Sequence, residues 1–113
     1  MLPYAAQSRE ADGSNEMDEQ RAEEAAHTHA RAIVQGDFGT MVRGMTPEGL
    51  AKAMAVGNST FKDFSYQLVH RERDGDDFVF HITFETDLGP LTFIERFRLI
   101  DGEWKMVDVE RAG

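Results

Sequence analysis

The stretch FVFHITFETDLGPLTFIERFRLIDGEWKMVDVE (residues 78–110) decides the fold of this chain. Apolar side chains alternate with polar ones along it, which predicts β-strands that bury one face. Turn-forming residues, above all Asp-Gly, interrupt the alternation and predict hairpins between successive strands. With the segment before it, the stretch predicts a meander of strands at about residues 64–73, 77–86, 91–100 and 103–110.

The first half of the chain has the residue spacing of helices. Residues 17–35 place apolar side chains three and four positions apart, and Gly36 is a natural end for such a helix. Asp37 and Thr46 are typical N-caps, so two shorter helices are expected after them. Residues 1–14 lack an apolar period and are predicted to form a flexible tail before the domain.

The order of these elements defines an α+β fold. We expect three N-terminal helices packed on a curved, four-stranded antiparallel meander sheet, because a sheet with one apolar face needs a covering layer. Hydrophobic residues make up 41% of the 113 residues, which is enough for the core of one small domain. The predicted domain spans residues 15–113.

Composition limits the classes of function. The formal net charge of -9 argues against binding to nucleic acid or to an anionic membrane surface. The chain has no cysteine, so it has no thiol nucleophile and no thiolate metal site. We see no signal peptide, and no apolar run approaches the roughly 18 residues that cross a membrane. We therefore expect a cytoplasmic protein that uses no cofactor.

The hairpin registers determine which side chains share the buried face. In the first hairpin, an odd-numbered loop with Gly75 as a bulge residue buries more apolar surface than a two-residue loop. That register places Phe64, Tyr66 and Leu68 on the phenylalanine-rich face. In the second hairpin the predicted partners are Phe84 with Phe93, Phe80 with Phe97, and Ile82 with Glu95.

Glu95 interrupts the apolar face of the third strand. A lone buried carboxylate costs several kcal/mol unless it is paired, hydrogen-bonded or protonated. A two-residue turn in the last hairpin would place Asp108 opposite Glu95 and create a carboxylate pair. An odd register would turn Asp108 toward the arginines of the other face and bring Val107 and Val109 into the core. We favour the odd register, and we expect the arginines of the sheet to be ion-paired: Arg71, Arg73, Arg96 and Arg98.

Two short motifs resemble the nuclear-transport-factor-2-like superfamily. They are Gly36-Asp37-Phe38 at the helix junction and Asp101-Gly102-x-Trp104-Lys105 before the last strand. The resemblance covers roughly residues 15–112 and implies the cystatin-like cone fold shared with ketosteroid isomerase, polyketide cyclases and scytalone dehydratase. This chain departs from the superfamily by lacking the usual strand between the second and third helices, which leaves the cone more open.

The resemblance implies a pocket between helices and sheet. A cofactor-free isomerase, dehydratase or cyclase of this kind would place an acid or a base in that pocket. In this sequence the implied catalytic residues are Glu95, Tyr66 and His29, and His70 would join them only if it points inward. The implied ligand contacts are Phe80, Phe84, Phe93, Phe97, Met106 and Asp108.

No metal site is expected from the sequence. His27 and His29 are two positions apart, and on a helix of about 100° per residue they diverge by about 160°, so they cannot share an ion. His70-x-Glu72 and His81 lie on predicted strands, and without a cysteine the deaminase-type His-x-Glu signature fails.

Two hypotheses of different classes follow. In the first, the domain binds a small apolar molecule between helices and sheet. In the second, it is a non-catalytic interaction or accessory domain with a filled core. We also expect a homodimer through the outer sheet face, since that face carries many apolar side chains among its arginines. These side chains are Val69, Val79, Thr83, Ile94 and Ile100, together with His81.

Overall fold

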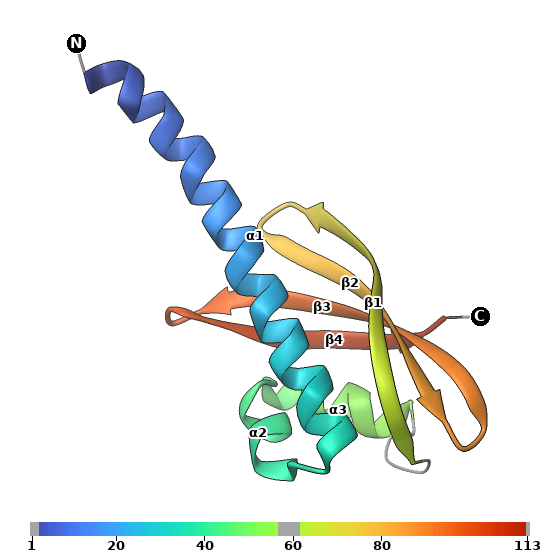
Figure 1. Ribbon diagram of the computed structural model, residues 1–113. Helices are drawn as coiled ribbons and strands as arrows, with labels where there is room; N and C mark the ends of the chain where they lie inside the picture. The colour runs from blue at the N-terminus through green and yellow to red at the C-terminus, as the bar shows by residue number, and fades with distance from the viewer. Residues whose placement is uncertain (1–2, 57–61, 113) are drawn as a thin grey trace.

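The computed structural model describes residues 3–56 and 62–112, with side chains from residue 16 onward. Three helices precede four antiparallel strands, and the strands pair in the order β1-β2-β3-β4, as predicted (Figure 1). The helices are α1 (Pro3–Gln35), α2 (Phe38–Arg43) and α3 (Pro47–Ala55). The strands are β1 (Asp63–Asp74), β2 (Asp77–Thr86), β3 (Gly89–Ile100) and β4 (Glu103–Arg111).

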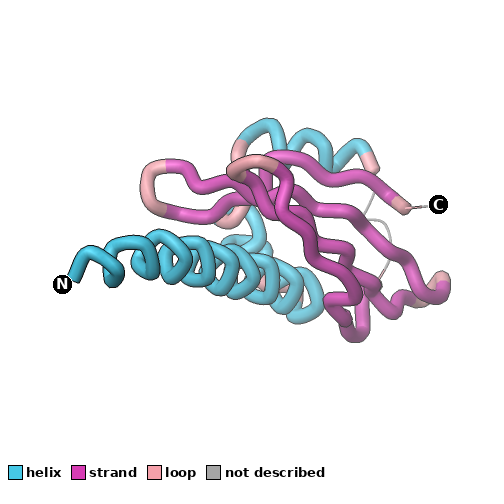
Figure 2. The backbone as a smooth tube through the Cα atoms, turned by 90° about the horizontal axis from the view of Figure 1, so that it is seen from above, coloured by secondary structure: helices cyan, strands magenta, loops and turns pink. Residues whose placement is uncertain are grey.

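Helix α1 is longer than the sequence predicts. It begins at Pro3 instead of Met17, and its first half extends away from the sheet (Figure 1). Its second half runs along one side of the sheet (Figure 2), where Ala22, Ala26 and Ala30 are fully buried. That residues 1–14 are flexible stays a prediction. Although α1 has 33 residues, none of the described helices carries an apolar stretch that could cross a membrane.

The two short helices are capped by the predicted residues. The Asp37 carboxylate accepts hydrogen bonds from the Thr40 amide at 3.2 Å and from the Thr40 hydroxyl at 2.7 Å. The Thr46 hydroxyl accepts from the Gly49 amide at 3.0 Å. Each cap satisfies an amide that has no partner inside its own helix, so it fixes where that helix begins.

The segment between α2 and α3 adds to the edge of the sheet. The Thr46 amide donates to the Met106 carbonyl at 3.1 Å, and the Met106 amide donates to the Gly44 carbonyl at 2.8 Å. Met45 thereby forms a parallel bridge to Met106 in β4. These bonds hold α3 against β4 and fix the two short helices relative to the sheet.

The first hairpin closes differently from the prediction. Asp74 pairs with Asp77, so the loop has only two residues. The extra residue lies inside β1, where a bulge at Val69 separates Leu68 from His70. A bulge in the strand supplies the same one-residue shift as an odd loop.

Beyond the Val69 bulge the predicted register is confirmed. Tyr66 lies opposite Phe84 and Leu68 opposite Ile82, and both pack against the core. The prediction for Phe64 is wrong, because a second irregularity between Asp63 and Ser65 leaves its side chain 56% exposed.

The second hairpin pairs two residues out of the predicted register. Thr86 pairs with Gly89, and Phe80 therefore lies opposite Glu95 and Ile82 opposite Phe93. The Thr86 hydroxyl explains the tighter turn, because it donates to the Gly89 carbonyl at 2.8 Å and accepts from the Leu88 amide at 3.0 Å. The predicted aromatic partners still touch as diagonal neighbours. Their ring centroids are 6.0 Å apart for Phe84 and Phe93, and 5.8 Å apart for Phe80 and Phe97.

The last hairpin combines both registers that the sequence left open. Ile100 pairs with Glu103 across the two-residue Asp-Gly turn. A bulge at Val107 then shifts the ladder, so Asp108 lies opposite Arg96 and Glu95 lies opposite Val109. The carboxylate pair is therefore absent. Val109 joins the core as the favoured register predicts, whereas Val107 does not.

The arginines of the sheet are engaged within the chain. Arg96 and Arg98 both bond the carboxylate of Asp77, and Arg96 also bonds Asp74. Arg71 bonds Glu23 of α1 at 3.0 Å. The expected ion pairing is confirmed for these three. Arg73 instead donates to the Gly75 carbonyl and lies over the ring of Phe78.

Candidate ligand site between the helices

An apolar cavity of about 320 Å³ lies between the three helices. Its walls come from α1, from α2, from Met45 between α2 and α3, and from α3. Every lining side chain is apolar except the imidazole of His29. The lining residues are His29, Phe38, Met41, Val42, Met45, Leu50, Ala53 and Met54. A mostly apolar wall with one polar group is the usual composition of a small-molecule site.

His29 points from α1 into the space between the helices and is only 3% exposed. Its Nδ1 atom has no hydrogen-bond partner in the described part of the chain. Burial lowers the pKa of His29 to about 4, and the Met41 backbone carbonyl opposes that shift only in part. The imidazole is therefore neutral at physiological pH, and its two ring nitrogens offer one donor and one acceptor.

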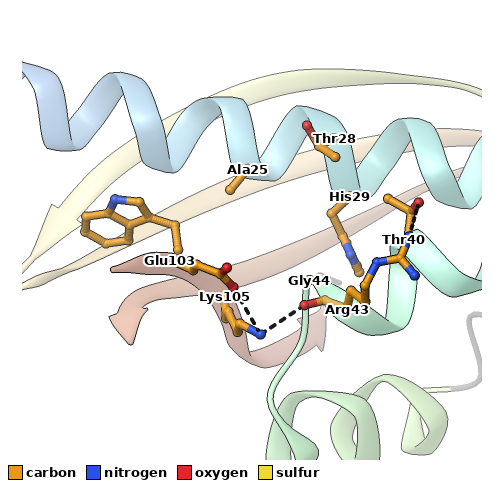
Figure 3. A pocket seen from close by; sticks show the side chains of 9 residues that line it. Ala25, Thr28, His29, Thr40, Arg43, Gly44, Glu103 and Lys105 are labelled. Carbon is orange, nitrogen blue, oxygen red and sulfur yellow. Dashed lines mark hydrogen bonds and ion pairs between the residues drawn. The ribbon is translucent and has the colours of Figure 1, made fainter. Parts of the chain in front are cut away.

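His29 also borders a second, more polar pocket of about 270 Å³ (Figure 3). Lys105 donates there to the Arg43 carbonyl at 3.2 Å and lies 3.4 Å from the Glu103 carboxylate. Arg43 donates to the Thr40 hydroxyl at 3.1 Å. His29 thus lies between an apolar space and a more polar one.

Glu95 is buried, as the alternation of β3 predicts, with 1% of its surface exposed. Its Oε1 atom has no hydrogen-bond partner among the described residues. Burial raises the pKa of Glu95 to about 8, so the protonated form predominates at neutral pH. Glu95 lines neither of the pockets beside His29.

The structure does not join the three catalytic residues that the resemblance implied. The Tyr66 hydroxyl is hydrogen-bonded to Nδ1 of His27 at 2.8 Å, and its ring contacts Phe84. His29 packs edge-on against Phe97, with ring centroids 6.3 Å apart. A direct hydrogen bond from Tyr66 or His29 to Oε1 of Glu95 is absent.

The residues predicted to contact a ligand fill the core instead of lining the helical cavity. Asp108 is the exception, because it turns outward and lies 3.5 Å from Lys52 of α3. None of the others lines either pocket beside His29. They are all less than 3% exposed: Phe80, Phe84, Phe93, Phe97 and Met106.

Most of the cavity wall was not predicted from the sequence. Met41, Met45 and Met54 were predicted to fill the core, because methionine usually plays that role. The sequence carries no local signal for the cavity, since apolar side chains that face inward are equally compatible with a filled core.

Solved structures share this fold at low sequence identity. A nuclear-transport-factor-2-like protein of unknown function from Shewanella baltica matches with a TM-score of 0.65 at 10% identity, over 86% of this chain and 95% of the other. A second such protein, from Burkholderia xenovorans, matches with a TM-score of 0.60 at 14% identity, over 85% and 84%. A protein of unknown function with a cystatin-like fold from Xanthomonas campestris matches with a TM-score of 0.50 at 20% identity, over 80% and 88%.

The chain therefore has the nuclear-transport-factor-2-like, cystatin-like α+β fold, and the fold implied by the sequence resemblance is confirmed. No family model and no curated protein matches the sequence. One fold of this kind serves many activities, so a function has to be argued from the site itself.

Proposed function

We propose that this domain binds a small, mostly apolar molecule with one hydrogen-bonding group in the cavity between α1, α2 and α3. The observation that carries the proposal is His29. Among the described residues it is the only polar side chain in the wall of this cavity, it is buried and neutral, and its Nδ1 has no hydrogen-bond partner there. An unpaired buried polar atom is costly, and a hydroxyl or carbonyl of a ligand would satisfy it.

The proposal concerns binding and not catalysis. Glu95 lines neither pocket beside His29, and the Tyr66 hydroxyl is already bonded to His27. A ligand in the helical cavity would therefore meet His29 but neither of the other two residues. This differs from the site implied by the resemblance, which lies between helices and sheet.

Methionine-methyl NMR can test the proposal, because the chain carries its own controls. Titration with 4-ethylphenol should shift the methyl signals of Met41, Met45 and Met54, which line the cavity. Met17, exposed on α1, and Met106, buried in the core, should not respond. Shifts of equal size at all five methyl groups would contradict a specific site.

Two substitutions examine the cavity and its polar group. Ala53→Leu fills the cavity and should abolish the shifts, whereas Ala51→Leu on the exposed side of α3 should not. His29→Leu should remove the preference for 4-ethylphenol over ethylbenzene, a preference of roughly 2- to 10-fold for one net hydrogen bond. Unchanged binding in Ala53→Leu would refute the assignment of the cavity.

A different class of function is also supported by one observation. Ile94 and Ile100 lie on the sheet face opposite the phenylalanines and stay partly exposed in the single chain. We propose, as the alternative, a non-catalytic domain that dimerises through this outer face. Light scattering should then give the mass of a dimer, and Ile94→Lys should convert it to a monomer. A monomeric wild-type protein would rule out this alternative.

A further inference from the structure

Two histidines and a glutamate meet on the outer face of the sheet. His70 and His81 are direct partners across β1 and β2, with ring centroids 4.8 Å apart and ring planes at 75°. Glu72 follows two positions along β1 and therefore shares their face. Its Oε1 atom lies 3.4 Å from Nε2 of His70 and 3.8 Å from Nε2 of His81.

These separations suit a single divalent ion. In a tetrahedral site with metal–ligand bonds of about 2.0–2.1 Å, neighbouring ligand atoms lie about 3.3 Å apart. The three ligand atoms here all lie within 4.8 Å of one another, so small side-chain rotations would bring them to one ion. The ladder between β1 and β2 already fixes the backbone, so little further ordering is needed.

The charges around Glu72 also favour a cation. In the described part of the chain its carboxylate has the two imidazoles beside it but no lysine or arginine. Arg96, on the same face, is bonded to Asp74 and Asp77. The chain as a whole carries a net charge of -9, which adds a general attraction for cations.

We propose that His70, Glu72 and His81 form a binding site for one divalent transition-metal ion of the zinc class. Two imidazoles and one carboxylate are a donor set that Zn²⁺ accepts, and Co²⁺ binds similar donors. Three protein ligands leave a fourth position open. The side chains of His70 and Glu72 are 54% and 53% exposed, so that position faces water. None of the three residues lines the helical cavity, so this site is independent of the proposed ligand.

Metal titration of the full chain tests this site. Co²⁺ should produce the visible absorption of a low-coordinate complex, and Zn²⁺ should displace it at one ion per chain. NMR should show the ring signals of His70 and His81 moving together with Zn²⁺, while those of buried His29 stay in place. Absence of saturable binding, or one ion for every two chains, would overturn the proposal.

Single substitutions identify the ligands. Each of three substitutions should weaken Zn²⁺ binding at least about tenfold: His70→Gln, Glu72→Gln and His81→Gln. A loss of about tenfold is the smallest that is typical when a residue that only supports a metal ligand is changed, so a direct ligand should lose at least as much. His27→Gln is the matched control, because His27 lies 3.6 Å from Glu23 and offers only a two-donor pair. Equal loss in the control would place the ion elsewhere and refute the assignment.

Discussion

Gly49 of α3 packs directly against the backbone carbonyl of Met106 in β4. A Cβ atom at position 49 would occupy the space of that oxygen, so this close approach requires glycine. The same carbonyl accepts the Thr46 amide, so helix and strand are joined by packing and by a hydrogen bond at one point. This junction also supports the floor of the helical cavity, since Leu50 and Ala53 lie on the same helix.

We expect Gly49→Ala to destabilise the protein by about 1–3 kcal/mol, because the backbone of α3 must move away from β4. Urea denaturation measures the change. Gly39→Ala in α2 is the control, since the nearest atom to its new Cβ belongs to the flexible end of Arg43. Alanine improves helix propensity at both positions by up to about 1 kcal/mol, so the difference between the variants isolates the clash. Equal stability of the two variants would contradict the close contact.

Glu95 should make stability fall as pH rises. Burial raises the pKa of Glu95 to about 8 from an ordinary value of 4.5, so the folded state binds its proton more tightly than the unfolded state. The stability that protonated Glu95 contributes is fully present below the pKa of 4.5 in the unfolded chain. It is lost as pH rises through the folded pKa of about 8. Within that window the slope approaches 1.4 kcal/mol per pH unit, roughly.

Glu95→Gln cannot ionise and should flatten this slope between about pH 5 and pH 9. Denaturation curves at several pH values for both proteins measure it. Asp63, whose pKa burial raises to about 6, titrates in both proteins and cancels in the comparison. Direct NMR titration gives an independent answer, and a pKa near the ordinary value of 4.5 would show that Glu95 is solvated.

His29 should act in the opposite direction, on the acid side. Its folded pKa of about 4 lies below the ordinary 6.5, so the unfolded state takes up the proton first. The stability is fully present above about pH 6.5 and is lost as pH falls toward 4. His29→Leu should lose less stability than wild type on acidification. An identical acid limb in both proteins would show that His29 is not buried in its neutral form.

Asp77 should contribute more to the free energy of unfolding than Asp74, the other acidic residue beside Arg96. Its side chain is 9% exposed and receives three guanidinium hydrogen bonds at 2.9 Å from Arg96 and Arg98. These bonds hold the pKa of Asp77 below its ordinary value. We expect Asp77→Asn to cost about 1–3 kcal/mol in thermal or urea unfolding. Asp74→Asn, which affects an exposed ion pair, should cost less than about 1 kcal/mol.

The alternation of apolar and polar residues in the strands was enough to predict most of the fold. The alternation in β2 and β3 correctly placed the phenylalanines on one face and Glu95 among them, because burial of a sheet face leaves a period of two. The exact residue pairs between neighbouring strands could not be predicted from this alternation. The partners of β2 were predicted two residues too far along β3, since any even shift in register preserves the faces.

Bulges limited the prediction of the outer face. If the alternation is continued from Tyr66 and Leu68, His70 falls on the buried face of the sheet. If it is counted back from the turn after Asp74, His70 falls on the outer face. Only the position of the extra residue, Val69, decides between these, and several positions in β1 were compatible with the pattern. The cluster of His70, Glu72 and His81 was therefore not evident until the register was known.

The helical cavity could not be found by patterning at all. Its wall is built from α2 and α3, whose apolar residues face inward in a filled core and in a hollow one alike. Whether these apolar residues fill the space or leave a cavity depends on the angles between the short helices. Those angles are set by the bonds of Gly44 and Thr46 to β4, which are long-range contacts with no local signature.

The bulge at Val69 also bears on how this strand tolerates changes in length. The residues on either side of Val69 keep consecutive partners in β2, namely Ile82 and His81. Deleting Val69 would therefore leave every paired residue with its present partner and on its present face. What the deletion would remove is the local bend that a bulge gives to a strand. The extra residue in β1 therefore contributes curvature around α1. The same pairing between β1 and β2 would be possible in a chain that is one residue shorter.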